Sequence, residues 1–252
     1  MRKHVPNLIT CLNATCGAMA IFLAARDRVL LAALLVLLAM IFDFMDGLAA
    51  RWLRATSAMG KELDSLADVV SFGVAPALLA YALVRDALPG NDAWGNAAWW
   101  AVALPYLPAI IPAFSAYRLA KFNLDERQAR SFIGMPTPAH ALFWVSLVLS
   151  RHYAPGVHEA AWGSPWILSA CVLLFSILLI SELPMFSLKI SSFAWGENRW
   201  RYSYLGLSCL LLLLARAAAV SFLVPLYAAF AVLEALVTRW GYNRRNRAGA
   251  RR

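Results

Sequence analysis

Four aspartates in the first third of the chain have the residue type and spacing of metal ligands. Asp43 and Asp46 lie three residues apart, and Asp64 and Asp68 lie four residues apart, so each pair falls on one face of a helix. Two antiparallel helices joined by a short loop would bring these faces together. Four converging carboxylates repel one another unless cations compensate them. Oxygen ligands of this kind suit Mg²⁺ or Mn²⁺, and two such ions form the clamp that serves phosphoryl displacement.

Small residues accompany the first pair of acids. Gly47 and Ala50 share a helix face with Asp43 and Asp46, and they leave room there for a ligand against the backbone. An ion- or proton-coupled transporter is an alternative, because acids inside a membrane also mark ion pathways. The acids gather at one end of their helices and do not form a trail across them, which favours an enzyme.

A purely structural role for the acids is the second alternative. Asp43 and Asp46 could pair with Arg51 and Arg54 at an interface, while Asp64 could serve as a helix N-cap. Such pairing explains one buried acid well. It does not explain four acids at this spacing, each of which is costly in a membrane.

The composition indicates that the helices carrying these acids cross a membrane. The chain of 252 residues is 62% hydrophobic and only 15% charged, whereas soluble domains are about half apolar and about a quarter charged. A crossing helix needs about twenty residues. Eight candidate spans follow from the apolar runs, near residues 8–25, 29–50, 65–84, 97–119, 136–151, 165–183, 202–215 and 217–238. A six-span layout with a partly inserted C-terminal hairpin is the alternative, and prolines 105, 108 and 112 predict a kink in the fourth span.

The basic residues predict the orientation of these spans. Eighteen of the 23 Lys and Arg residues fall in the termini and in alternate loops, and the other five fall on the opposite side. The excess of positive charge marks the cytoplasmic side. Both termini and the loops 51–63 and 120–133 are therefore predicted to face the cytoplasm, as is the end that bears the acids. Because the net charge of +9 lies in these short loops and in the tail from Arg239, we expect membrane lipids and no nucleic acid as its partners.

The segment from Asp43 to Asp68 resembles the signature of the CDP-alcohol phosphatidyltransferase family. It reads Asp-x2-Asp-Gly-x2-Ala-Arg-x8-Gly-x3-Asp-x3-Asp, with all eight fixed positions and both gaps present over 26 residues. The resemblance implies an all-α polytopic transmembrane bundle, usually a homodimer, with its site open to the cytoplasm. It implies that Asp43, Asp46, Asp64 and Asp68 hold two Mg²⁺ or Mn²⁺ ions, and that Asp68 is also the general base.

The same resemblance implies where the nucleotide lies. Gly47, Ala50 and Gly60 would line the pocket for the CDP-activated lipid, and Arg51 would lie at its edge near the phosphates. Ser65, next to Asp64, is a further candidate for this pocket.

Segments outside the signature resemble the integral-membrane phosphatidylserine synthases of this family. They are residues 6–13, 64–76, 118–123, 132–136 and 184–189. The resemblance implies that CDP-diacylglycerol and L-serine are the substrates and that CMP is released. Glycerol 3-phosphate, inositol phosphate and choline are the alternative acceptors within the family. Because the resemblance ends near residue 190, we expect a catalytic domain over 1–190, followed by a transmembrane hairpin and basic tail over 191–252.

Two further pairs of residues are candidates for substrate binding. Arg118 and Lys121 lie one helical turn apart, and two cations suit the carboxylate of serine and the diphosphate of the lipid. The family commonly has arginine at the second position, and lysine lacks the planar fork for a bidentate contact. Ordinary flanking charges at a membrane boundary are the alternative. Asn7 and Thr10 are nucleotide-pocket candidates by resemblance, with helix capping at the membrane interface as the alternative.

Overall fold

The computed structural model describes residues 4–88, 99–124, 132–185 and 195–249, and these residues are almost entirely helical. The first half of the bundle consists of α1 (His4–Ala24), α2 (Val29–Trp52), α3 (Ala58–Asp68), the π-helical turn η1 (Val69–Val74), α4 (Ala75–Asp86), α5 (Trp99–Ala103), the 3₁₀ segment η2 (Leu104–Ala109) and α6 (Ile110–Leu124). The second half consists of α7 (Thr137–Tyr153), α8 (Pro155–Trp162), α9 (Pro165–Ile180), α10 (Trp195–Ala215), the 3₁₀ turn η4 (Arg216–Ala219) and α11 (Val220–Gly249). The all-α fold class is thereby confirmed.

Within the part of the chain that the structure describes, five helical stretches are long and apolar enough to cross a membrane. They are His4–Ala24, Val29–Trp52, Ala58–Asp86, Trp99–Leu124 and Asn198–Val237, and the pair α8 and α9, bent by 73°, would be a sixth. Each of the eight predicted spans has a helical counterpart, but α7 has only 17 residues. The count of full-length spans within the described ranges is therefore nearer the six-span alternative.

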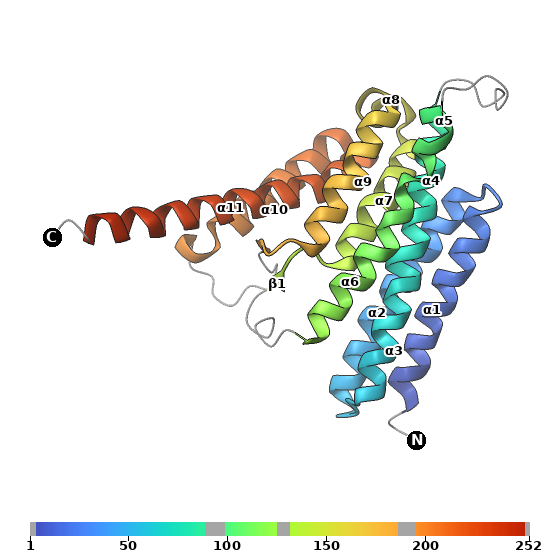
Figure 1. The fold of residues 1–252 in the computed structure, drawn as a ribbon, viewed down its shortest axis with the longest axis horizontal. Helices are drawn as coiled ribbons and strands as arrows, with labels where there is room; N and C mark the ends of the chain where they lie inside the picture. Colours follow the sequence, from blue (N-terminus) through green and yellow to red (C-terminus); the bar gives the residue numbers. More distant parts are fainter. Residues whose placement is uncertain (1–3, 89–98, 125–131, 186–194, 250–252) are drawn as a thin grey trace.

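The last stretch is a hairpin and not one straight helix. Tyr204 on α10 packs its ring against Tyr227 and Phe230 on α11, with ring centroids 5.9 and 6.2 Å apart. Figure 1 shows this hairpin leaning away from the helices α1 to α6, which run side by side. The predicted C-terminal hairpin is thus present, and its second helix, α11, packs against α7.

The fourth span is interrupted where the sequence predicted a kink. Pro105 and Pro108 lie in η2, between α5 and α6, because proline cannot donate the main-chain bond of a continuous helix. The third span also changes its winding, at η1, one residue after Asp68. Pro76, the second residue of α4, contributes to that change, because it has no amide hydrogen to donate to the Phe72 carbonyl in η1.

Close packing of small residues seats α1 against η1. A Cβ atom on Gly17 would lie 2.3 Å from Ser71 Oγ, and one on Gly73 would lie 3.1 Å from Ser115 Cβ. The Ser71 hydroxyl also donates a hydrogen bond of 3.0 Å to the Asn13 carbonyl oxygen. These contacts fix the helix that carries Asp68 between α1 and α6.

The hydrophobic core lies in the middle of the bundle, around α7. Phe143, Trp144 and Leu147 are fully buried there, and Phe143 stacks on Phe175 of α9 with centroids 4.2 Å apart. A two-residue antiparallel pair, β1 (Phe132–Ile133) with β2 (Pro184–Met185), ties the start of α7 to the end of α9. Gly134 follows β1 with φ of +74°, a conformation that favours glycine.

Ion pairs join three chain segments at the end of the bundle opposite the aspartates. Arg85 on α4 contacts Asp27 and Asp86 at 2.8 Å, and Asp86 contacts Arg151 of α7 at 2.7 Å. The structure thus places Arg85 and Arg151 together, as the predicted sidedness of the loops requires. Several residues used in that prediction lie outside the described ranges, namely Arg2, Lys3, Arg127, Arg130, Lys189, Arg251, Arg252 and part of the 120–133 loop.

We expect the two ends of the bundle to be labelled from opposite sides of the membrane. Met59 on α3 is 71% exposed at the end that bears the acids, and Val157 on α8 is 44% exposed at the other end. In a background lacking the four native cysteines, an impermeant maleimide applied to intact cells should label Val157→Cys but not Met59→Cys. The reverse pattern would overturn the predicted orientation.

Candidate active site

Three of the four predicted acids form a compact cluster. Asp43 on α2 and Asp64 and Asp68 on α3 each offer a carboxylate oxygen, and these oxygens all lie within 4.8 Å of one another. Asp68 is 7% exposed. The Oδ1 atoms of Asp64 and Asp68 are buried and accept no hydrogen bond. Such unpartnered carboxylate oxygens fit a hard divalent cation, which prefers oxygen ligands.

The loop between α2 and α3 determines how the acids of α3 are placed along the helix axis relative to those of α2. Ser57 is the N-cap of α3, and its hydroxyl accepts a hydrogen bond of 3.0 Å from the Gly60 amide. The Ala55 amide donates to the Ala50 carbonyl at the end of α2. Because Ser57 caps the helix, the predicted alternative of Asp64 as the N-cap is wrong.

The alternative of pairing with arginine is not supported either. Among the described residues, no ion pair within 4.0 Å joins Asp43 or Asp46 to Arg51 or Arg54. The Arg51 guanidinium instead lies over Gly47, with Nη1 3.5 Å from the place a Cβ would occupy. Arg51 and Arg54 therefore do not occupy the carboxylates of Asp43 and Asp46.

Asp46 has a different partner from the other three acids. Its Oδ2 accepts a hydrogen bond of 2.6 Å from the hydroxyl of Thr10 on α1. Both residues are buried, at 6% and 3% exposure. The acid thus lies where α1, α2 and α3 converge.

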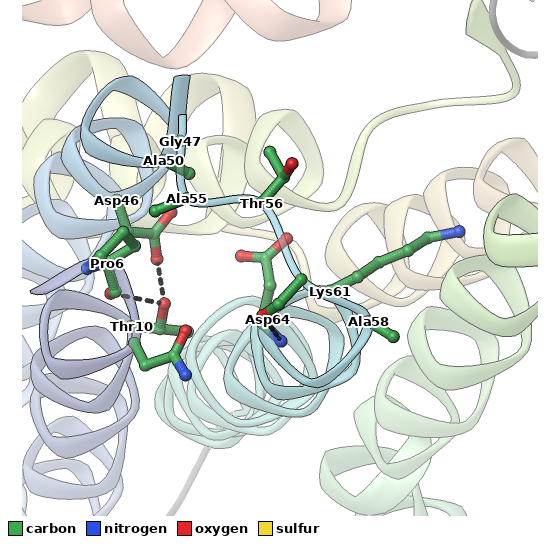
Figure 2. A pocket seen from close by; sticks show the side chains of 13 residues that line it. Pro6, Thr10, Asp46, Gly47, Ala50, Ala55, Thr56, Ala58, Lys61 and Asp64 are labelled. Atoms are coloured by element: carbon green, nitrogen blue, oxygen red, sulfur yellow. Dashed lines mark hydrogen bonds between the residues drawn. The ribbon is translucent and has the colours of Figure 1, made fainter. Parts of the chain in front are cut away.

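A cavity of about 560 Å³ opens beside Asp46 and Asp64, within the usual size range of small-molecule sites. Figure 2 shows both carboxylates at its wall. Five predicted nucleotide-pocket residues line it, which are Asn7, Thr10, Gly47, Ala50 and Gly60. The small residues keep the space open, since a Cβ on Gly60 would lie 3.2 Å from Asn7 Oδ1.

Two other predicted pocket residues are not among those that line the cavity. Arg51 lies over Gly47, as described above. Ser65 faces α6, where its hydroxyl accepts a hydrogen bond of 2.8 Å from Asn123 Nδ2 and donates to the Lys61 carbonyl. Its hydroxyl therefore links helices.

Sequence reasoning missed several residues of the cavity. Thr56, Ser57 and Lys61 line it, and Lys61 extends away from Asp46 in Figure 2, with its ammonium 3.0 Å from the Asn123 carbonyl oxygen. Lys61 directly follows Gly60 of the signature, so its position in the motif was the available signal. Asn123 lies in the segment 118–123 that resembles phosphatidylserine synthases, but that segment did not indicate its contact with Lys61.

The structure separates Arg118 from Lys121. Arg118 on α6 is 7% exposed, interacts electrostatically with Asp68, and has a buried Nε without a hydrogen-bond partner. Its guanidinium lies 5.4 Å from the centre of the Phe122 ring. Lys121 faces outward and pairs with Glu182 at 3.1 Å. Only Arg118 therefore joins the acid cluster.

Comparison with known proteins agrees with this site. The family model for CDP-alcohol phosphatidyltransferase matches residues 3–193. The chain is 39% identical over 153 residues to the CDP-diacylglycerol–serine O-phosphatidyltransferase of Bacillus subtilis, covering 61% of this chain and 78% of that protein.

Two further relatives carry the same name. The protein of Helicobacter pylori (strain 26695) is 36% identical over 183 residues, covering 71% of this chain and 70% of its own length. The protein of Mycobacterium tuberculosis (strain H37Rv) is 35% identical over 189 residues, covering 72% of this chain and 60% of its own length. The match of the family model over most of the chain, together with these relatives, shows that the protein belongs to the CDP-alcohol phosphatidyltransferase family.

Proposed function

We propose that the protein transfers the phosphatidyl group of CDP-diacylglycerol to the hydroxyl of L-serine, giving phosphatidylserine and CMP. The observation that carries the proposal is the convergence of Asp43, Asp64 and Asp68 beside a cavity, in a chain of this family. The serine acceptor is supported by the names of the B. subtilis, H. pylori and M. tuberculosis relatives.

The four aspartates would hold two Mg²⁺ or Mn²⁺ ions. Their donor set is entirely oxygen, and two of its oxygens are buried without a partner, which fits such ions. When bound, the ions would polarise the phosphoryl oxygens and neutralise charge on the diphosphate. Because burial of uncompensated carboxylates is costly, the ions would also stabilise the arrangement of α2 and α3.

The nucleotide of the lipid substrate would occupy the cavity. Asn7 offers amide hydrogen-bonding groups there, and Gly47, Ala50 and Gly60 leave space for the base and ribose. Arg51, over Gly47, would lie at the edge near the diphosphate. Ser65 keeps a nucleotide role only if its hydroxyl leaves Asn123.

The reaction is a displacement at the phosphorus that bears diacylglycerol. The serine oxygen forms a bond to this phosphorus while the bond to the CMP oxygen breaks, and CMP leaves. Asp68 takes the proton of the serine hydroxyl, which is a weak nucleophile without a base. Arg118 would bind the serine carboxylate or a phosphate oxygen, since its guanidinium is buried and interacts electrostatically with Asp68.

Lys121 has less structural support as a substrate ligand than Arg118, because it pairs with Glu182 outside the cavity. A role for Lys121 would require that this exposed pair opens, which costs little. We retain it as a weaker candidate for binding serine or phosphate.

The remaining proposals concern the setting of the site. Several apolar helices make the protein a multi-pass membrane protein. We place it in the inner membrane, and the charge asymmetry supports a site that faces the cytoplasm. A match ending at residue 193 supports a catalytic domain over 1–190 and a separate hairpin and tail over 191–252. The homodimer rests on the family resemblance.

Substitution of Arg118 tests the choice of acceptor. We expect Arg118→Ala to lower kcat/KM for serine by about 10- to 100-fold, the usual cost of losing a hydrogen bond to a charged group. CMP release would be measured with serine, glycerol 3-phosphate, inositol phosphate and choline as acceptors. Arg26→Ala, an exposed arginine at the other end of the bundle, should behave as wild type.

Each outcome of the acceptor panel is decisive. A wild-type preference for glycerol 3-phosphate, inositol phosphate or choline would contradict the serine assignment but keep the family activity. CMP release that did not depend on any added alcohol would contradict transfer to an alcohol. A transporter would release no CMP at all.

A further inference from the structure

Thr10 makes a contact that its predicted role as a nucleotide ligand does not explain. Its hydroxyl lies 2.6 Å from Asp46 Oδ2, across 36 residues of sequence and between two different helices. That length is typical of a hydroxyl that donates to an ionised carboxylate. Figure 2 shows the side chain pointing at the carboxylate from the side of α1.

The Thr10 hydroxyl has two possible acceptors but only one proton to donate. Thr10 Oγ1 also lies 3.1 Å from the Pro6 carbonyl oxygen, one turn earlier on α1. Both neighbours are acceptors when Asp46 is ionised, and a hydroxyl has one proton to donate. The shorter contact to the charged oxygen takes that proton, so Asp46 Oδ2 is held and Oδ1 is the carboxylate oxygen that Thr10 leaves free.

The backbone around Thr10 is fixed by further contacts on the same face of α1. Asn13 and Gly17 follow it at i+3 and i+7, and both contact Ser71 of η1. Gly17 allows no side chain there, because a Cβ would lie 2.7 Å from Ser71 Cα. The packing of α1 against η1 therefore determines the position of Thr10 relative to Asp46.

We infer that Thr10 is a positioning residue for the metal site, which orients the Asp46 carboxylate and does not recognise the nucleotide. This inference rests on the proposed function, since it takes Asp46 as a metal ligand. A carboxylate turns broadly about its last torsion, and a donor behind it fixes the oxygen that faces the ion. Asp46 stands apart from the compact cluster of Asp43, Asp64 and Asp68, so the orientation of its carboxylate depends on the Thr10 hydroxyl together with the Gly47 amide.

Three variants test the role of the hydroxyl. Thr10→Val keeps the shape of the side chain and removes the donor, and Thr10→Ser keeps the donor. Thr15→Val is the matched control, because the Thr15 hydroxyl lies on the same helix and donates to the Cys11 carbonyl one turn back. Binding of Mn²⁺ to the detergent-solubilised protein, without substrate, would be followed by the electron paramagnetic resonance of free Mn²⁺.

Loss of an outer-shell partner typically weakens metal binding by about 10- to 100-fold. We expect Thr10→Val to weaken Mn²⁺ binding by that factor, while Thr10→Ser and Thr15→Val stay within about threefold of wild type. If Thr10→Val does not melt as the wild type does, Thr10→Ala replaces it as the variant without a hydroxyl.

The outcomes separate this inference from the proposed function. If wild type binds Mn²⁺ and Thr10→Val binds it equally well, the inference is overturned while the proposed function stands. If Thr10→Val instead weakens the binding of CMP with Mn²⁺ affinity unchanged, Thr10 is a nucleotide ligand. Failure of the wild-type protein to bind Mn²⁺ would overturn the metal-dependent function and this inference with it.

Discussion

Removal of divalent cations is expected to abolish turnover, and addition of Mg²⁺ or Mn²⁺ is expected to restore it. Asp43, Asp64 and Asp68 would otherwise present uncompensated negative charge to the diphosphate of the substrate. Metal ions contribute several kcal/mol of charge stabilisation to such displacements, so we expect a loss of at least about 10³-fold in kcat. CMP release would be measured after exhaustive chelation and again after each metal is added back.

The chelation experiment requires a control for folding. Cations also offset repulsion between α2 and α3, so the chelated protein must be shown to melt cooperatively and to regain full activity when metal returns. Calcium is a useful third ion, because it accepts longer bonds and looser geometry than Mg²⁺. An enzyme that stayed fully active after chelation would contradict the two-metal site.

The cluster of acids could be predicted because local periodicity determines most of it. The spacings 43–46 and 64–68 place each pair on one face of a helix, and a short loop makes the two helices antiparallel neighbours. The structure brings Asp43, Asp64 and Asp68 within 4.8 Å. Asp46 belongs to the same pattern, but its carboxylate accepts a hydrogen bond from Thr10. The three-residue spacing of Asp43 and Asp46 does not indicate that partner.

The different fates of Arg118 and Lys121 show where periodicity is insufficient. Residues three apart share a helix face only approximately, at about 300° of rotation. The orientation of α6 decides which residue is buried, and packing of Gly73 against Ser115 sets that orientation. The partner of Lys121 is Glu182, which lies 61 residues away. Contacts between distant segments of this kind are not encoded in any local pattern.

The π-helical form of the turn after Asp68 could not be predicted either. Pro76 signals a disturbed helix, because it cannot donate to the Phe72 carbonyl, but the apolar character of Val69–Val74 suits an ordinary helix. The turn occurs where α1 and α6 both approach closely, at Gly17 against Ser71 and at Gly73 against Ser115. Widened turns are frequent at functional sites. Here the turn rotates the side chains that follow Asp68 relative to those before it. Asp68 can therefore face α2 while Ser71 faces α1.

The number of membrane spans could not be predicted from the length of each apolar run, because composition does not determine where an apolar helix begins and ends. An apolar run of 17 residues, as in α7, suits a short crossing as well as a buried core helix. Its burial in the middle of the bundle shows that it is packed mainly against protein. The start of α2 and the end of α10 were predicted to the residue or nearly so. The third span begins seven residues before the predicted position 65, α10 begins seven residues before 202, and α11 ends eleven residues after 238.

Substitution of Asp68 by asparagine is expected to have the second large effect. The hydroxyl of serine is a poor nucleophile at neutral pH, so a base must take its proton as the bond to phosphorus forms. Asp68 is 7% exposed, carries a buried oxygen without a partner, and lies near Arg118, our candidate for binding the acceptor. The signature contains no histidine, and its lysine, Lys61, directs its ammonium to the Asn123 carbonyl oxygen.

Asp68→Asn keeps the size of the side chain and one oxygen ligand but removes the basic oxygen. General-base catalysis typically contributes about 10²- to 10⁴-fold, so we expect kcat to fall by at least that factor at saturating metal, with CMP binding largely retained. Glu62→Gln, an exposed acid on the same helix, is the matched control and should leave kcat unchanged. Loss of CMP and Mn²⁺ binding along with kcat would assign Asp68 a ligand role alone. Turnover near that of the wild type would place the base elsewhere, and since Asp43 and Asp64 are the other carboxylates of the cluster, the same substitution at those positions would then identify it.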